Sequence, residues 1–173
     1  DHILPKSLDH ILFVLALFFL STGLRPLLWQ ITAFTLAHTV TLALGALGWV
    51  QAPAAIVEPL IAASIAFVAV ENLFTNTLSR WRPLVVFGFG LLHGLGFASV
   101  LGEFGLPQDQ FIPALIGFNI GVELGQLTVI AIAFLVVGYW FGRKPWYRTR
   151  IAMPASAVIA LIGVYWMIER VFL

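Results

Sequence analysis

The sequence LWQITAFTLAHTVTLALGALGWV, residues 28–50, sets the class of protein. It contains no Asp, Glu, Lys or Arg. As a helix rising ~1.5 Å per residue, it is long enough to cross the ~30 Å hydrocarbon core of a bilayer. It also carries His38 well inside the run. Because ionisable side chains are costly inside a membrane and are rare there, the run predicts a membrane-spanning helix that holds part of a functional site.

Five further apolar runs accompany this one, and short segments rich in Gly, Pro, Asn or basic residues separate them. The six predicted spans are approximately 8–24, 28–50, 54–74, 84–101, 111–141 and 151–173. The fifth is too long for a straight crossing and should tilt or extend beyond the bilayer. The sequence thus predicts one all-α domain over residues 1–173, a polytopic membrane protein with six transmembrane helices.

Composition excludes the main alternatives. Hydrophobic residues make up 61% of the chain, charged residues 10%, and the mean hydropathy is +1.01, whereas soluble domains are ~45–50% apolar and ~25% charged. The net charge of +1 provides no basic field for nucleic acid. The absence of cysteine removes disulfides and thiolate metal sites.

The placement of basic residues predicts the orientation, because Lys and Arg are retained on the cytoplasmic side. Seven lie in loops on one side: Arg25, Arg80, Arg82, Arg143, Lys144, Arg148 and Arg150. The other side has only Lys6 and Arg170. Both termini are therefore expected in the periplasm, in the inner membrane of a bacterium. The chain begins at Asp1 without a methionine, so we expect a processed N-terminus, with room for an exported upstream domain or a partner subunit.

Polar residues inside the spans predict the site. They are Asp9, His10, His38, Glu71, Asn72, His93, Asn119, Glu123 and Gln126. No Lys or Arg falls in a predicted span core, so these acids and imidazoles should lack basic partners and attract a cation. His38, His93 and Glu123 are expected in the outer half of the membrane. Imidazole with carboxylate suits nickel, cobalt or zinc.

Spacing along the fifth span separates two faces. Asn119, Glu123 and Gln126 form one polar stripe, while Gly117, Gly121 and Gly125 form another on roughly the opposite side, where a neighbouring helix should pack closely. Near the cytoplasmic end of the third span, Glu71 and Asn72 have two interpretations. They either cap the helix or pair with Arg80 or Arg82, or they form an inner waypoint on a cation path.

Several motifs together resemble the HupE/UreJ family. They are HILPKSLDH at 2–10, AFTLAHTVTL at 33–42, VEN at 70–72, FGLLHGLGFA at 89–98 and GFNIGVELGQ at 117–126. The resemblance covers essentially the whole chain and is closest to a branch whose membrane domain follows an exported N-terminal region. It implies a nickel or cobalt permease of the kind associated with hydrogenase and urease maturation. By position it also implies functional roles for His2, Asp9, His10, His38, His93 and Glu123.

Three functions remain open at this point. The leading one is a permease for a divalent transition-metal ion, which is dehydrated by the histidines and acids and leaves inward past Glu71 and Asn72. The first alternative is an intramembrane zinc-dependent hydrolase acting on a lipid or membrane peptide, using the same residues. The second is a noncatalytic membrane anchor subunit whose polar groups hold helices together. No catalytic residue is assigned.

Overall fold

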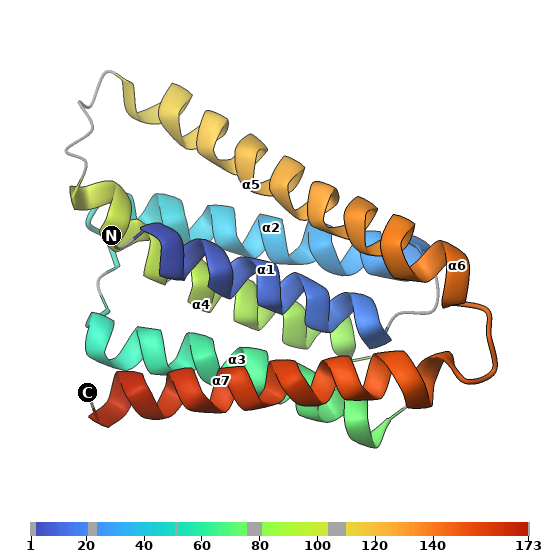
Figure 1. The fold of residues 1–173 in the computed structure, drawn as a ribbon. Coiled ribbons are helices and arrows are strands. Elements are labelled where there is room, and N and C mark those ends of the chain that lie inside the picture. Colours follow the sequence, from blue (N-terminus) through green and yellow to red (C-terminus); the bar gives the residue numbers. More distant parts are fainter. Residues whose placement is uncertain (1–2, 21–23, 51, 76–80, 104–109, 173) are drawn as a thin grey trace.

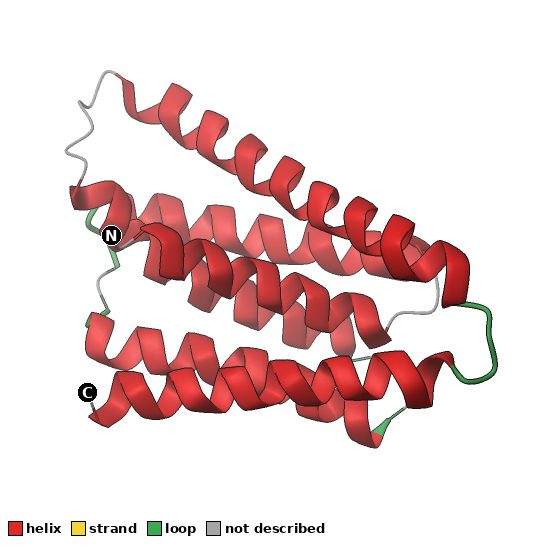
Figure 2. Cartoon of the chain, viewed as in Figure 1, coloured by secondary structure: helices red, strands yellow, loops and turns green. Residues whose placement is uncertain are grey.

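The computed structural model describes residues 3–20, 24–50, 52–75, 81–103 and 110–172, and within these ranges every regular element is helical (Figures 1 and 2). The helices are α1 (Ile3–Leu20), α2 (Leu24–Ala46), α3 (Ala54–Phe74), α4 (Arg82–Glu103), α5 (Phe111–Ala133), α6 (Tyr139–Phe141) and α7 (Met153–Phe172). A π-helical turn, η2 (Phe134–Gly138), joins α5 to α6, and a second, η3 (Arg148–Ala152), leads into α7. The chain thus forms six helical rods, which confirms the predicted all-α fold.

Among the residues that the structure describes, four segments are long and apolar enough to cross a membrane: Arg25–Ala46, Ala55–Phe74, Ile112–Phe141 and Arg148–Phe172. The apolar stretches of α1 and α4 are shorter, Leu8–Phe19 and Arg82–Ala98. By helix composition the chain is a multi-pass membrane protein.

The predicted bounds of the second span were displaced by about one turn. The α2 helix already begins at Leu24, with Pro26 in its first turn, where a missing backbone N–H costs no hydrogen bond. It ends at Ala46 in a Schellman motif. Gly48 has a φ of +79°, its N–H donates to Gly45 O at 3.1 Å, and the next N–H, of Trp49, donates to Leu44 O at 3.0 Å. Residues 47–50 therefore lie beyond the helix, and glycine chemistry rather than hydrophobicity sets its end.

Two helix pairs, α2 with α4 and α3 with α7, pack closely because glycines remove the side chains between their backbones. A Cβ added to Gly90 would lie 2.5 Å from Phe34 O, and one added to Gly94 would lie 2.5 Å from His38 O. One added to Gly163 of α7 would lie 2.9 Å from Ala66 N in α3. The backbones thus meet at distances that a larger residue forbids.

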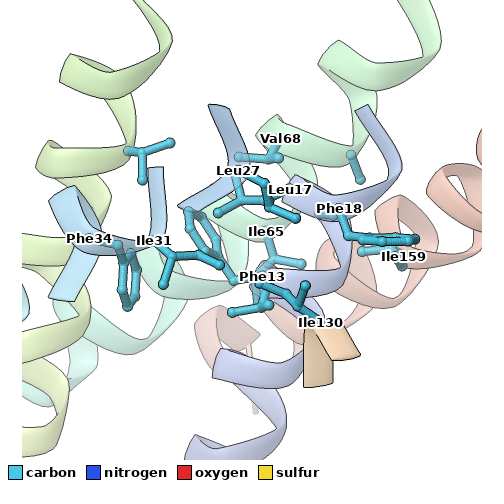
Figure 3. Packing of buried hydrophobic residues seen from close by; sticks show 14 of the residues in the cluster. Phe13, Leu17, Phe18, Leu27, Ile31, Phe34, Ile65, Val68, Ile130 and Ile159 are labelled. Atoms are coloured by element: carbon cyan, nitrogen blue, oxygen red, sulfur yellow. The ribbon is translucent and has the colours of Figure 1, made fainter. Parts of the chain in front are cut away.

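The α1 helix lies among the others and supplies the centre of the hydrophobic core. Phe13, Ala16 and Leu17 of α1 are 1% exposed or less. Figure 3 shows Phe13 and Leu17 beside side chains from other helices, among them Ile31 and Ile65. His10 comes one helical turn before Phe13, so the same periodicity that buries Phe13 turns His10 toward the core.

The α5 helix is attached differently. In Figure 1 it lies apart from the other helices at its N-terminal end and approaches them toward α6. A Cβ added to Gly117, Gly121 or Gly125 would meet no described atom within 4 Å. The predicted close packing along this glycine stripe is therefore wrong for the described chain, since the face of α5 that meets α2 is the polar one.

Candidate metal centre

Three histidines from three helices meet in the core. The His10 ring of α1 lies between the other two, with its centroid 5.0 Å from that of His38 in α2 and 5.1 Å from that of His93 in α4. Both contacts are edge-to-face, with interplanar angles of 83°. The exposed fractions are 8% for His10, 0% for His38 and 1% for His93. Chain segments far apart in sequence thus place three imidazoles in one buried cluster, named here the imidazole cluster.

Aromatic rings enclose the imidazole cluster. The Phe34 ring has its centroid 5.4 Å from that of His10 and 5.1 Å from that of His93. The Phe97 ring lies 4.6 Å from His10, and Phe118 of α5 stacks over His38 at 6.4 Å with an interplanar angle of 15°. These walls keep bulk water away from the imidazoles, which strengthens any electrostatic interaction within the cluster.

The hydrogen bonds of the imidazole cluster are few. His93 Nε2 lies 3.2 Å from Ser64 Oγ of α3, while His93 Nδ1 is buried with no hydrogen-bond partner among the described residues. Within the same ranges neither nitrogen of His38 makes a well-formed hydrogen bond, although the Asn119 side chain is near enough to interact with it. Polar atoms so deeply buried ordinarily find partners, so their state calls for a functional explanation.

The His10 ring lies at metal-ligand spacing from each of the other two rings, but the three side chains do not form a metal-holding group as they stand. An imidazole centroid lies ~3.2 Å from a metal ion bound at ~2.1 Å, so two ligand rings at ~90–109° have centroids ~4.5–5.2 Å apart. The observed 5.0 and 5.1 Å fall in this range. In the part of the chain that the structure describes, no group of three His, Asp or Glu side chains is arranged to hold one metal ion together. Binding of one ion by all three imidazoles would therefore require these side chains to move.

The polar stripe of α5 faces α2 beside the imidazole cluster. Thr35 Oγ1 donates to Gln126 Oε1 at 2.9 Å, and Thr39 Oγ1 lies 2.8 Å from the Asn119 side-chain amide. Glu123 lies on the same stripe between these two anchors and is half-buried. Its Oε2 atom is buried and has no hydrogen-bond partner among described atoms. Glu123 thus offers a carboxylate oxygen on the face of α5 that meets α2.

Asp9 has a basic partner, contrary to the prediction. Its Oδ1 accepts a hydrogen bond from Arg170 Nη2 at 2.9 Å, and the side chains are 4% and 16% exposed. Arg170 Nη1 also donates to Glu58 O at 3.0 Å. Arg170 is near the C-terminal end of α7, and the fold returns it to the start of α1, where both ends of the chain lie (Figure 1). The guanidinium therefore neutralises the carboxylate next to His10.

Glu71 is also paired. Arg82 Nη1 lies 3.0 Å from Glu71 Oε1, and the Arg82 side chain is 1% exposed. This confirms the pairing interpretation of Glu71 and contradicts the expectation that acids in the spans lack basic partners. The predicted fourth span begins at residue 84, which leaves Arg82 in a loop. The α4 helix instead begins at Arg82 itself.

Asn72 joins helices at the same end of the bundle. Its Nδ2 donates to Ala16 O of α1 at 2.7 Å and to Ser156 Oγ of α7 at 3.2 Å. The Asn72 backbone oxygen accepts from Arg148 Nη2 at 3.0 Å. The observed contacts of Asn72 hold helices together. His2, the remaining candidate, lies outside the described residues.

A cavity of about 410 Å³ lies between α1, α4 and α5. Its walls are mostly apolar, and His10 and Gln126 contribute polar atoms to them. Gly121 and Gly125 line the same cavity, which explains why a Cβ at either position would meet nothing. The cavity brings open volume to one member of the imidazole cluster.

Fold and site together define a polytopic α-helical membrane protein with buried imidazoles where three of its helices meet. The sequence model of the family described as HupE / UreJ protein matches residues 1–170. The chain therefore belongs to the HupE/UreJ family, as its motifs indicated. Neither a curated protein nor a solved structure matches it.

Proposed function

We propose that this chain is a permease for nickel or cobalt ions and that the imidazole cluster is its intramembrane binding site. Membership of the HupE/UreJ family supports this cargo. The observation that carries the proposal is the meeting of three buried histidines, in which the His10 ring lies at metal-ligand spacing from both His38 and His93. Imidazole nitrogens are suitable donors for both metals, and the chain has no thiolate that would select a softer ion.

The imidazoles supply neutral donors that replace part of the hydration shell of the ion, and carboxylates supply the opposing charge. Glu123 is one such group, because its buried Oε2 has no hydrogen-bond partner in the described chain. Asp9 is the other, since it precedes His10 and is held by Arg170. A divalent ion takes up Asp9 only as Arg170 leaves it, so one cation replaces another beside the imidazole cluster.

Two ion pairs lie at opposite ends of the proposed route of the ion. With the termini in the periplasm, as the distribution of basic residues predicts, Asp9 with Arg170 lies at the outer end and Glu71 with Arg82 at the inner end. Each pair joins different helices, so opening either end separates a carboxylate from its guanidinium. Alternation between the two ends would move an ion through the bilayer without an open channel.

Transport into liposomes tests the proposal. Purified protein should carry Ni(II) or Co(II) into vesicles that contain a metal-sensitive dye, and His38→Ala or His93→Ala should abolish the flux. Glu169→Gln serves as a control, because it changes an exposed polar side chain on α7 and should leave the flux unchanged.

The other outcomes separate the remaining functions. Bound metal with no flux, together with cleavage of a lipid or a membrane peptide, would favour the zinc-dependent hydrolase. The absence of both bound metal and flux would favour a noncatalytic anchor subunit. Undiminished flux in both histidine variants would overturn the assignment of the site.

A further inference from the structure

Ser64 is a buried polar residue in an otherwise apolar part of α3. It is 2% exposed, and its neighbours in sequence, from Ile61 to Val70, are otherwise aliphatic, alanine or phenylalanine. Its hydroxyl makes two contacts: Oγ lies 2.6 Å from Ile61 O and 3.2 Å from His93 Nε2. Ser64 is thus the group through which α3 reaches the imidazole cluster.

The two distances fix the direction of both hydrogen bonds. A hydroxyl oxygen and a carbonyl oxygen 2.6 Å apart repel each other unless a proton lies between them. Ile61 O has no proton to give, so Ser64 donates its single proton to Ile61 O. The Ser64 oxygen can then only accept from His93 Nε2, which must carry the hydrogen.

The other nitrogen of His93 follows from this. A neutral imidazole carries one N–H, so Nδ1 holds a lone pair when Nε2 is protonated. His93 Nδ1 is buried and, within the described ranges, makes no hydrogen bond. The partner of one ring nitrogen generally determines which nitrogen is left to bind a metal.

We propose that Ser64 is a positioning residue that holds His93 as the Nε2–H tautomer and thereby leaves Nδ1 as the metal donor. This rests on the proposed metal site, but the tautomer itself is a property of the metal-free protein. A serine that only bonded back to its own helix would leave the two tautomers of His93 free to exchange. The contact between α3 and α4 at Ser64 prevents that exchange.

The first measurement needs no metal. In protein labelled with ¹⁵N-histidine, the His93 signals are assigned by their loss in His93→Gln. We expect wild type to show a protonated Nε2 and an unprotonated Nδ1. Ser64→Ala should give a mixture of tautomers, and Ser64→Thr, which keeps a hydroxyl, should restore the single tautomer. A wild-type His93 protonated at Nδ1 would overturn the proposal.

The second measurement is the affinity for Ni(II) or Co(II) in detergent. Loss of an orienting partner typically weakens metal binding ~10–100-fold, and we expect Ser64→Ala to do so, with recovery in Ser64→Thr. Ser156→Ala is the matched control, because it removes a buried hydroxyl that bonds to Asn72 instead of to a histidine.

The outcomes distinguish the two proposals. Wild-type affinity in Ser64→Ala, with the tautomers mixed, would overturn the positioning role while leaving the metal site in place. Failure of wild type to bind either metal would overturn the proposed function, and the NMR result would still decide which nitrogen of His93 carries the hydrogen.

Discussion

The glycines at the contacts of α4 and α7 look like the glycines of α5 in sequence and behave in the opposite way. Gly90, Gly94 and Gly163 lie where two backbones approach so closely that a Cβ would collide with the neighbouring helix. On α5, the equivalent Cβ positions at Gly117, Gly121 and Gly125 would meet no described atom within 4 Å. In one part of the molecule the glycines bring two backbones into steric contact, and along the glycine stripe of α5 they do not.

The difference shows what attaches α5. Hydrogen bonds join Thr35 of α2 to Gln126 and Thr39 to Asn119. Phe118 of α5 also stacks on His38, and Ile130 lies in the hydrophobic core. Beside these bonds lie the cavity and the imidazole cluster. A helix held by side-chain contacts without close backbone packing can move relative to its neighbours at lower cost than one whose backbone is in steric contact. The closely packed pairs α2–α4 and α3–α7 therefore form a rigid part of the molecule, named here the frame. The α5 helix forms a side of the site that can move, named here the adjustable wall.

Gly94→Ala should have the largest effect, because the new methyl group would collide with Thr41 Oγ1 and lie 2.5 Å from His38 O. Overpacking of this kind costs ~1–3 kcal/mol and occasionally more, and two backbone segments must part here, so we expect a loss of about 3 kcal/mol. Unfolding by SDS in mixed micelles measures it. Gly88→Ala on the same helix meets nothing within 4 Å in the described structure and should unfold like wild type. Equal stability of the two variants would refute the steric frame.

Glu71→Gln should have the next largest effect within the frame, because it leaves the Arg82 guanidinium buried without its opposing charge. Removing one member of a buried pair costs ~3–5 kcal/mol, and since the Glu71 side chain is 22% exposed we expect about 2 kcal/mol. The same SDS titration applies. Adding Arg82→Met removes the unpaired charge and should recover most of the loss. An additive double variant would mean that the pair contributes nothing of its own.

How much of the fold could be predicted from the sequence depends on whether a local pattern or the tertiary structure determines each feature. Long apolar runs predicted all six helices, because burial in a bilayer requires them. The end of α2 was missed by one turn, because a Schellman motif at Gly48 ends that helix while the hydrophobic run continues to Val50. The partner of Asp9 was missed because Arg170 sits at the far end of the chain, and only the tertiary fold returns it to the acid. The pairing of Glu71 with Arg82 could be anticipated, because the two residues lie close in sequence at the same end of neighbouring spans.

Some features of the candidate site could likewise be predicted from the sequence, and others could not. Each of His10, His38 and His93 could be singled out because an ionisable residue inside an apolar run is conspicuous. Their meeting in one cluster depends on the close approach of α2 to α4 and on the central place of α1, which no local pattern encodes. Ser64 carried no signal at all, since a lone serine in a membrane helix usually bonds back to its own carbonyls.

The hydrogen bonds of α5 should matter less than the frame. Interhelical hydrogen bonds in membrane proteins contribute ~0.6 kcal/mol on average, so we expect Asn119→Ala with Gln126→Ala to cost about 1 kcal/mol in total. The effect should be local. Hydrogen–deuterium exchange should rise along α5 and remain unchanged in α3 and α7, whose packing does not involve these side chains. Faster exchange throughout the protein would show that α5 belongs to the frame.

Gly121→Ala should have the smallest effect and gives the sharpest contrast with Gly94→Ala, because the same methyl group is added to a helix facing open space. Alanine gains up to ~1 kcal/mol over glycine in helix propensity, so stability in SDS should stay the same or rise slightly. The methyl group does enter the cavity that His10 lines. A change in metal flux at unchanged stability would therefore show that the cavity serves the site. A loss of stability as large as that of Gly94→Ala would mean that a second helix occupies this face in the membrane, and the distinction between frame and adjustable wall would fail.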